Sequence, residues 1–107
     1  MDKPLIVVNF KTYETAMGDS ALTLAKAMDN FTDRDFRMIA VVSAFDLSTI
    51  SNSVSSVEVW SQHLDPVGKG SHTGWLEPDL ALHHGAVGTI INHAEHKVTI
   101  EHVEKLM

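Results

Sequence analysis

Two short apolar segments of this chain end abruptly in polar and ionisable side chains. The first segment leads into Asn9 and Lys11, and the second, near the far end, leads into His93 and Glu95. Because burying an unpaired charge costs free energy, ionisable residues are unexpected at the end of an apolar strand unless they form a binding or catalytic site there. Ligands of α/β folds bind beyond the carboxyl ends of strands. We therefore expect an amide, an ammonium, an imidazole and a carboxylate to surround one small anion.

Each of these four residues also has an ordinary structural interpretation. Lys11 alone could be a solvated loop lysine, and Asn9 could be a turn-forming asparagine. His93 alone could be a structural histidine, and Glu95 could simply stabilise the start of a helix. The residue types by themselves leave both interpretations open.

The composition is that of a globular protein of at most one ordinary domain. The chain has 107 residues, a net charge of −6 and no cysteine. The negative charge argues against nucleic acid as a partner. The lack of cysteine excludes disulfides and thiol chemistry and favours a cytoplasmic location. No apolar run approaches the ~20 residues that span a bilayer, and the first residues do not read as a signal peptide, so no membrane partner is expected.

Strand-like and helix-like segments alternate along the chain. The apolar runs predict strands over 5–10, 36–42, 57–62 and 86–92, the first of them buried on both faces. Helix signals predict a helix that opens at Gly18-Asp19 with Asp19 or Ser20 as its cap, one over about 46–53, one from Pro78 to Gly85 and one after Thr99. In these helices, the apolar positions expected to face inward are Ala21, Leu24, Ala25, Met28, Phe31, Leu47, Ile50, Ile100, Val103 and Leu106.

Four strand–helix units predict an α/β fold with parallel strands and right-handed crossovers. Such a (βα)4 chain could be a small open sheet or half of an eight-stranded (β/α)8 barrel, whose usual length is ~250 residues. In the second case residues 1–107 are the N-terminal half of a barrel domain. Because the last helix has barely formed at Met107, we expect the chain to be a fragment.

Three motifs, in order, resemble the triosephosphate isomerase family in its archaeal form. Asn-Phe-Lys at 9–11 is similar to the family's Asn-x-Lys motif on the first strand. Gln-His-Leu-Asp at 62–65, followed by Gly-Ser-His-Thr-Gly at 70–74, looks like its third strand and third loop. Asn-His-Ala-Glu at 92–95 resembles its His-Ser-Glu motif after the fourth strand. The resemblance extends from Pro4 to Met107 and implies half of a TIM barrel.

This resemblance implies an isomerase that interconverts dihydroxyacetone phosphate and glyceraldehyde 3-phosphate through an enediolate, in glycolysis and gluconeogenesis, without a cofactor. Lys11 would hold the substrate's charge and stabilise the enediolate, and Asn9 would orient Lys11 and the substrate. His93 would polarise the carbonyl as a neutral imidazole, and Glu95 would pair with Lys11 in the empty site. The neutral histidine is an established feature of this family rather than a deduction from the sequence.

The same resemblance implies which parts of the active site the 107 residues do not contain. The family's general base is a glutamate at the end of the sixth strand, followed by a mobile lid, and its phosphate site follows the seventh and eighth strands. Because proton abstraction needs a base within about 3 Å of the substrate carbon, we expect this chain alone to be inactive.

The third loop of the family docks into a partner subunit. The resemblance therefore implies a homo-oligomer, a dimer or tetramer, with Thr73 and Trp75 at the interface. Two departures from the family pattern lie beside His93. Ala94 replaces the usual serine, which removes a hydroxyl hydrogen bond, and His96 belongs to a changed basic pair.

Seven histidines raise the question of a metal site. His93 and His96 are three residues apart and would share one face of a helical turn. A zinc site, however, needs three or four converging ligands, and no such set is evident in the sequence, so we expect no metal. His63 and His72 flank the third loop, where a structural or interface role is expected.

A different class of function is a binding module without catalysis. Two copies of a half-barrel could self-associate and close one eight-stranded barrel. A third possibility is a partly folded remnant, because an open half-barrel exposes two sheet edges.

Overall fold

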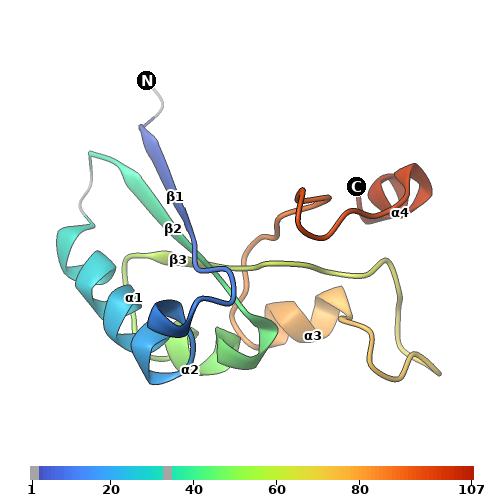
Figure 1. The fold of residues 1–107 in the computed structure, drawn as a ribbon, viewed down its shortest axis with the longest axis horizontal. Coiled ribbons are helices and arrows are strands. Elements are labelled where there is room, and N and C mark those ends of the chain that lie inside the picture. The colour runs from blue at the N-terminus through green and yellow to red at the C-terminus, as the bar shows by residue number, and fades with distance from the viewer. Residues whose placement is uncertain (1–2, 33–34) are drawn as a thin grey trace.

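The computed structural model of the chain describes residues 3–32 and 35–107, and its centre is a three-stranded parallel sheet (Figure 1). The strands are β1 (Leu5–Asn9), β2 (Arg37–Val42) and β3 (Glu58–Ser61), in the order β1-β2-β3. Val8 lies opposite Ala40, and Ala40 in turn lies opposite Val59. The parallel order confirms the α/β class that the alternation predicted.

Helical segments follow each strand. The 3-10 helix η1 (Glu14–Ala16) and helix α1 (Asp19–Phe31) follow β1, and η2 (Ala44–Asp46) with α2 (Leu47–Ser51) follows β2. Helix α3 (Pro78–His83) follows β3, and α4 (Ile100–Leu106) comes last. Within the described residues, no helix is both long enough and apolar enough to cross a membrane.

The helix ends largely follow the sequence signals. Pro78 occupies the first turn of α3, and the chain leaves this helix through Gly85 at a φ of 98°, a conformation that favours glycine. The Thr99 hydroxyl accepts a hydrogen bond from the His102 backbone N–H and so caps α4. The start of α1 differs from the prediction: Gly18 is its cap, and Asp19 is already helical.

The core lies between the sheet and helices α1 and α2. Small side chains on α1 let it approach β2 closely, and Leu47 and Ile50 of α2 are buried as predicted. The buried cluster includes Phe10, Ala21, Ala25, Met28, Ala40, Val42, Leu47, Ile50, Val57 and Val59. This packing fixes the carboxyl ends of β2 and β3.

The burial predicted from the sequence is wrong at three places in the chain: β1, Phe31 and Ile100. Residues Leu5, Ile6 and Val7 of β1 are 50%, 42% and 47% exposed, so β1 is not buried on both faces. Among the residues that the structure describes, β1 is an edge strand that pairs with β2 alone, and α1 and α2 lie beside β2 and β3 (Figure 1). Phe31, the last residue of α1, and Ile100, the first residue of α4, are also exposed, and α4 contains no buried residue.

The predicted fourth strand over 86–92 does not form a regular strand in the described residues. The segment runs beside β3, and its pairing is one parallel bridge between Ser61 and Thr89. A side chain at Gly88 would overlap the Trp60 ring, so the backbone packs closely against that ring there. Gly88 thus brings the 86–92 segment, and the residues after it, against β3.

Candidate active site

Lys11 leaves β1 in an unusual backbone conformation that two amide side chains hold. Its φ is 54°, in the left-handed region that residues other than glycine seldom adopt. The Asn9 side-chain oxygen accepts a hydrogen bond from the Lys11 N–H at 2.9 Å. The Gln62 side-chain nitrogen, from the exit of β3, donates to the Lys11 carbonyl at 2.7 Å. Both peptide groups of Lys11 are therefore fixed before any ligand arrives.

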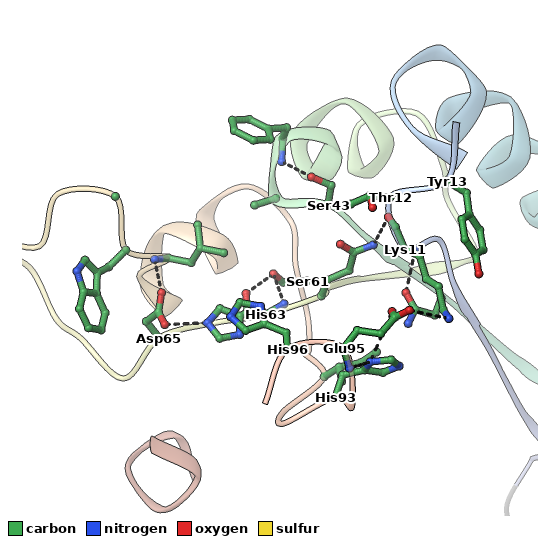
Figure 2. A pocket seen from close by; sticks show the side chains of 18 of the residues that line it. Lys11, Thr12, Tyr13, Ser43, Ser61, His63, Asp65, His93, Glu95 and His96 are labelled. Atoms are coloured by element: carbon green, nitrogen blue, oxygen red, sulfur yellow. Dashed lines mark hydrogen bonds and ion pairs between the residues drawn. The ribbon is translucent and has the colours of Figure 1, made fainter. Parts of the chain in front are cut away.

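The Lys11 ammonium forms an ion pair with Glu95, which lies 84 residues away in the chain (Figure 2). Lys11 Nζ lies 3.2 Å from Glu95 Oε2 and 5.6 Å from the centre of the Tyr13 ring. Donation to Glu95, followed by the interaction with Tyr13, raises the pKa of Lys11 above its usual value of 10.5. The ammonium therefore stays charged throughout the neutral range and can hold an anion.

His93 lies in a tight turn that sets its ring orientation. Its Nδ1 accepts a hydrogen bond from the Glu95 backbone N–H at 3.0 Å, so Nδ1 carries no proton and Nε2 is the donor. The His96 N–H donates to the His93 carbonyl at 2.8 Å and closes the turn. Asn92 precedes it at a φ of 62° and accepts from the Val98 N–H at 2.9 Å. This arrangement presents a neutral imidazole as a hydrogen-bond donor.

An open cleft of about 1140 Å³ joins these groups. Asn9, Lys11, His93 and Glu95 all line it, so the structure brings together the four residues predicted from the two strand exits. Figure 2 shows Lys11, Glu95 and His93 as near neighbours, each coming from the carboxyl end of its segment. The cleft can do two things chemically: bind an anion at Lys11 and donate a hydrogen bond to a carbonyl from His93.

The predicted interface residues line the same cleft. Thr73 and Trp75 are exposed, and Trp75 is 55% accessible, which leaves both free to contact another molecule. No partner chain is present, so their interface role stays a prediction.

Sequence reasoning did not assign roles to Gln62 and Tyr13. Gln62 lies at the exit of β3, at the same sheet edge as Asn9 and Lys11, and that position was the available signal. Tyr13 follows Lys11 by two residues, a spacing without a recognisable pattern. Gln62 fixes the Lys11 backbone, and Tyr13 contributes to the environment of its ammonium.

A second polar group occupies the far wall of the cleft. His63 Nε2 lies 2.8 Å from Asp65 Oδ1, and the His63 ring stacks on the His96 ring at 4.0 Å. Burial tends to raise the pKa of the Asp65 carboxyl, but hydrogen bonds from the Leu76 N–H and from His63 outweigh it and lower the pKa below 3.8. Asp65 is therefore an anion at neutral pH.

Comparison with known proteins places this architecture in one family. Residues 4–107 match the family model described as triosephosphate isomerase. This chain belongs to the triosephosphate isomerase family. It is 38% identical to the triosephosphate isomerase of Archaeoglobus fulgidus over 101 residues and 35% identical to that of Methanothermus fervidus over 108 residues. These matches confirm the resemblance to archaeal triosephosphate isomerases.

The matches also confirm the half-barrel architecture. The crystal structure of triosephosphate isomerase from Bartonella henselae superposes with a TM-score of 0.72 at 25% identity, covering 87% of this chain and 39% of that one. The match with the Archaeoglobus enzyme covers 94% of this chain and 45% of the relative. The match with the Methanothermus enzyme covers 100% of this chain and 48% of the relative. It thus spans about half the length of the curated triosephosphate isomerases it matches.

Proposed function

We propose that the chain supplies the Asn9, Lys11, His93 and Glu95 part of an active site that interconverts dihydroxyacetone phosphate and glyceraldehyde 3-phosphate. This reaction belongs to glycolysis and gluconeogenesis, which fits a cytoplasmic location. The observation that carries the proposal is the Lys11–Glu95 ion pair, because it brings both strand-exit motifs to one cleft. The substrate is a phosphorylated triose, and the chemistry needs no cofactor.

Lys11 acts as the cation for the substrate's negative charge. In the empty cleft Glu95 neutralises it, and an incoming phosphorylated triose exchanges that partner for its own oxygens. As the enediolate forms, negative charge develops on the substrate oxygens, and a fixed ammonium stabilises this charge more than it stabilises the ground state. Because Asn9 and Gln62 hold the Lys11 backbone, little reorganisation is needed at that moment.

His93 polarises the substrate carbonyl through Nε2–H. Its Nδ1 is occupied by the Glu95 backbone N–H, which supports the neutral tautomer. A neutral imidazole in this role is an established property of these isomerases. In these isomerases a separate general base removes the carbon-bound proton. The resemblance places that base on a sixth strand.

The 107-residue polypeptide alone should therefore show no useful turnover. Without a base within about 3 Å of the substrate carbon, the largest single proton-transfer contribution, about 10²–10⁴-fold, is lost. Isomerase activity of the isolated chain within about tenfold of the Archaeoglobus enzyme would refute this expectation, since proton transfer alone contributes more than that.

Binding of 2-phosphoglycolate, a phosphate-bearing mimic of the enediolate, tests the site directly. Chemical-shift titration should show weak binding by the 107-residue chain, with perturbations around Asn9, Lys11 and His93. Lys11→Met should abolish binding, whereas Lys26→Met on the exposed face of α1 should leave it unchanged. Equal binding by both variants would contradict the assignment of Lys11.

Catalysis can be tested by supplying the missing half in trans. Strands five to eight of the Archaeoglobus relative, added as a separate polypeptide, should restore isomerase activity to the 107-residue chain. That activity should disappear with Lys11→Met and with His93→Gln and survive Lys26→Met. Restored isomerase activity that persists in Lys11→Met would contradict the role proposed for Lys11.

Self-association of two half-barrels remains the second candidate function. The free edge of β1, with Leu5, Ile6 and Val7 partly exposed, favours it because such an edge accepts another strand. Sedimentation velocity should then give a dimer of the 107-residue chain. Replacing Val7 by lysine should return it to a monomer, and a monomer in the unmodified chain would exclude this candidate.

The homo-oligomer of the complete barrel is proposed to use Thr73 and Trp75. Both residues are exposed beside the cleft, so a partner subunit that binds there would also shape the site.

A further inference from the structure

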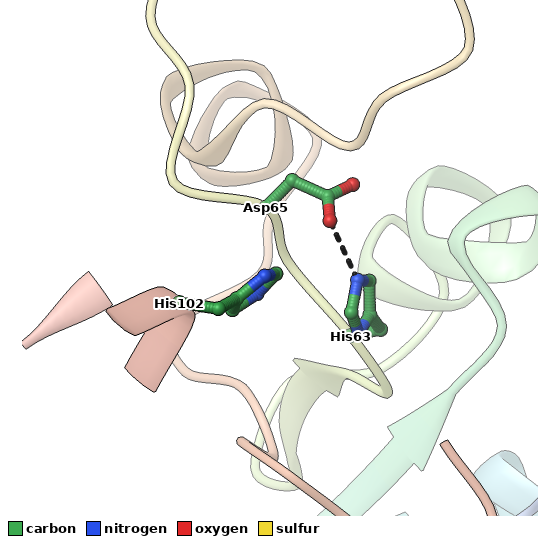
Figure 3. A group of neighbouring side chains, drawn as sticks. All are labelled: His63, Asp65 and His102. Carbon is green, nitrogen blue, oxygen red and sulfur yellow. Dashed lines mark hydrogen bonds and ion pairs between the residues drawn. The ribbon is translucent and has the colours of Figure 1, made fainter. Parts of the chain in front are cut away.

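Three side chains that can ligate metals lie close together (Figure 3), and two of them, His63 and Asp65, line the far wall of the cleft. His63 and Asp65 come from the loop after β3, and His102 comes from α4. One ligand atom from each of them lies within 4.8 Å of the other two, and all three side chains are half-buried. Their sequence separation, two and 37 residues, follows no familiar metal-binding pattern, which is why the sequence did not predict them together.

Each of the three side chains is already held in place. Asp65 uses Oδ2 to accept from the Leu76 N–H at 2.8 Å, which leaves Oδ1 toward His63. His102 Nε2 lies 3.0 Å from the carbonyl of Leu64, the residue between the other two. The His63 ring lies flat on the His96 ring, with 6° between their planes. Because these rotamers are fixed in the empty protein, an ion would meet little of the usual ordering cost.

We propose that His63, Asp65 and His102 bind one divalent transition-metal ion of the zinc class. Two imidazoles and one carboxylate are ligands that suit Zn²⁺ and Co²⁺, whereas Mg²⁺ and Ca²⁺ prefer oxygen ligands alone. A tetrahedral ion with bonds of about 2.0–2.2 Å holds its ligands about 3.4 Å apart, so ligand atoms that already lie within 4.8 Å of one another need only small adjustments to bind it. The fourth position stays open to water.

When the ion binds, His63 Nε2 and Asp65 Oδ1 exchange their contact with each other for bonds to the metal. A neutral His63 ring that binds through Nε2 carries its proton on Nδ1, so the ring keeps that proton. A ligating Asp65 carboxylate compensates part of the ion's charge. No redox change or co-reactant is involved.

The ion would also fasten α4 to the rest of the fold. Helix α4 contains no buried residue, and Figure 1 shows it apart from the sheet. Within the described residues, the hydrogen bond from His102 to the Leu64 carbonyl is the only one that links α4 to the loop after β3. A metal bond between the same two segments is stronger than that hydrogen bond. The ion would therefore hold α4 in place, at the opposite wall of the cleft from Lys11 and the proposed isomerase chemistry.

Titration of the metal-free 107-residue chain with Zn²⁺ and Co²⁺ tests the proposal. Calorimetry should find one Zn²⁺ per chain, and Co²⁺ should give the visible absorption of a four-coordinate complex. His102→Gln and His63→Gln should each weaken binding by more than about tenfold, the loss that follows removal of even an outer partner of a metal ligand. The matched control His83→Gln, an exposed histidine outside the cluster, should leave the affinity unchanged.

A measurement on the unmodified chain keeps the test independent of whether the variants fold. Zn²⁺ should shift the ring-nitrogen resonances of His63 and His102 and leave those of His72 and His83 in place. Shifts spread evenly over all histidines would overturn the proposal, as would equal Zn²⁺ affinity in His102→Gln and His83→Gln. Retained 2-phosphoglycolate binding in His102→Gln would show that the metal site and the substrate site fail independently.

Discussion

Replacing Asp29 by alanine should lower the free energy of unfolding by about 2–3 kcal/mol at pH 7. The Asp29 carboxylate, near the end of α1, accepts hydrogen bonds from the backbone N–H groups of Ser55, Ser56 and Val57, the last two at 2.7 and 2.9 Å. These three residues lead into β3. Asp29 therefore ties α1 to the start of the strand whose far end carries Gln62.

The magnitude follows from how much water can reach each donor. A hydrogen bond to a charged acceptor contributes about 1.5–3 kcal/mol, but water can replace it at an exposed donor. The Ser55 and Ser56 bonds are exposed, whereas the Val57 bond is partly buried. The estimate adds the full contribution of the Val57 hydrogen bond, about 2 kcal/mol, to small contributions of the hydrogen bonds from the two serines. Asp29→Asn keeps one acceptor oxygen and should lose about 1 kcal/mol.

The effect should depend on pH in a defined direction. Burial tends to raise the pKa of Asp29, but the hydrogen bonds from Val57, Ser56 and Ser55 outweigh it and lower the pKa below 3.8. A carboxyl whose folded-state pKa is lowered stabilises the fold above its unfolded-state value and loses that contribution as pH falls through the folded-state value. The difference between Asp29→Asn and the unmodified chain should thus be constant from about pH 5 to 8 and shrink below about pH 4.

Urea unfolding followed by circular dichroism at several pH values measures these differences. Glu104→Gln, which removes an exposed carboxylate on α4, is the matched control and should have no effect. Faster amide exchange at Ser56 and Val57 in Asp29→Ala would locate the lost bonds. A loss below about 0.5 kcal/mol, the range of ordinary surface substitutions, would refute the reasoning.

Three further predictions concern the cleft and its support. Gly88→Ala should lower the free energy of unfolding by about 1–3 kcal/mol, because its methyl group would overlap the Trp60 ring, and thermal unfolding measures this. Glu95→Gln should lower the pKa of Lys11 toward 10.5, since the largest cause of its raised value is removed, and NMR titration of the methylated lysine reports it. Gln62→Leu should weaken 2-phosphoglycolate binding by about fivefold, because a lost hydrogen bond of about 1 kcal/mol frees the Lys11 backbone, and an unchanged affinity would contradict this role.

The placement of the candidate-site residues was predictable because a general rule of parallel sheets decides where they lie. Asn9 and Lys11 follow one apolar run and His93 and Glu95 another, and the carboxyl ends of such segments meet at one edge. The ion pair between Lys11 and Glu95 is the direct result. The backbone conformation of Lys11 was not predictable, since it depends on Gln62 from a different strand.

The errors arose where burial depends on neighbours that a periodic pattern does not specify. The apolar residues 5–8 predict a strand correctly, but β1 is an edge strand and remains partly exposed. The apolar residues 86–92 likewise lie beside β3 without forming a regular strand. The bonds from residues 55–57 to Asp29, and the grouping of His63 with His102, join segments that are distant in sequence, so no local signal announces them.

Two residues other than glycine adopt a positive φ at the candidate site: Lys11 lines the cleft, and Asn92 directly precedes His93, which also lines it. Such conformations cost on the order of 1–3 kcal/mol each and persist only when the surrounding structure enforces them. Because the strain is already present in the folded protein, the hydrogen-bond donors of Lys11 and His93 are oriented before a ligand binds. A substitution that relieves the strain in either turn should therefore raise the free energy of unfolding and lower the affinity for the ligand. Stability and ligand binding would respond in opposite directions to the same substitution.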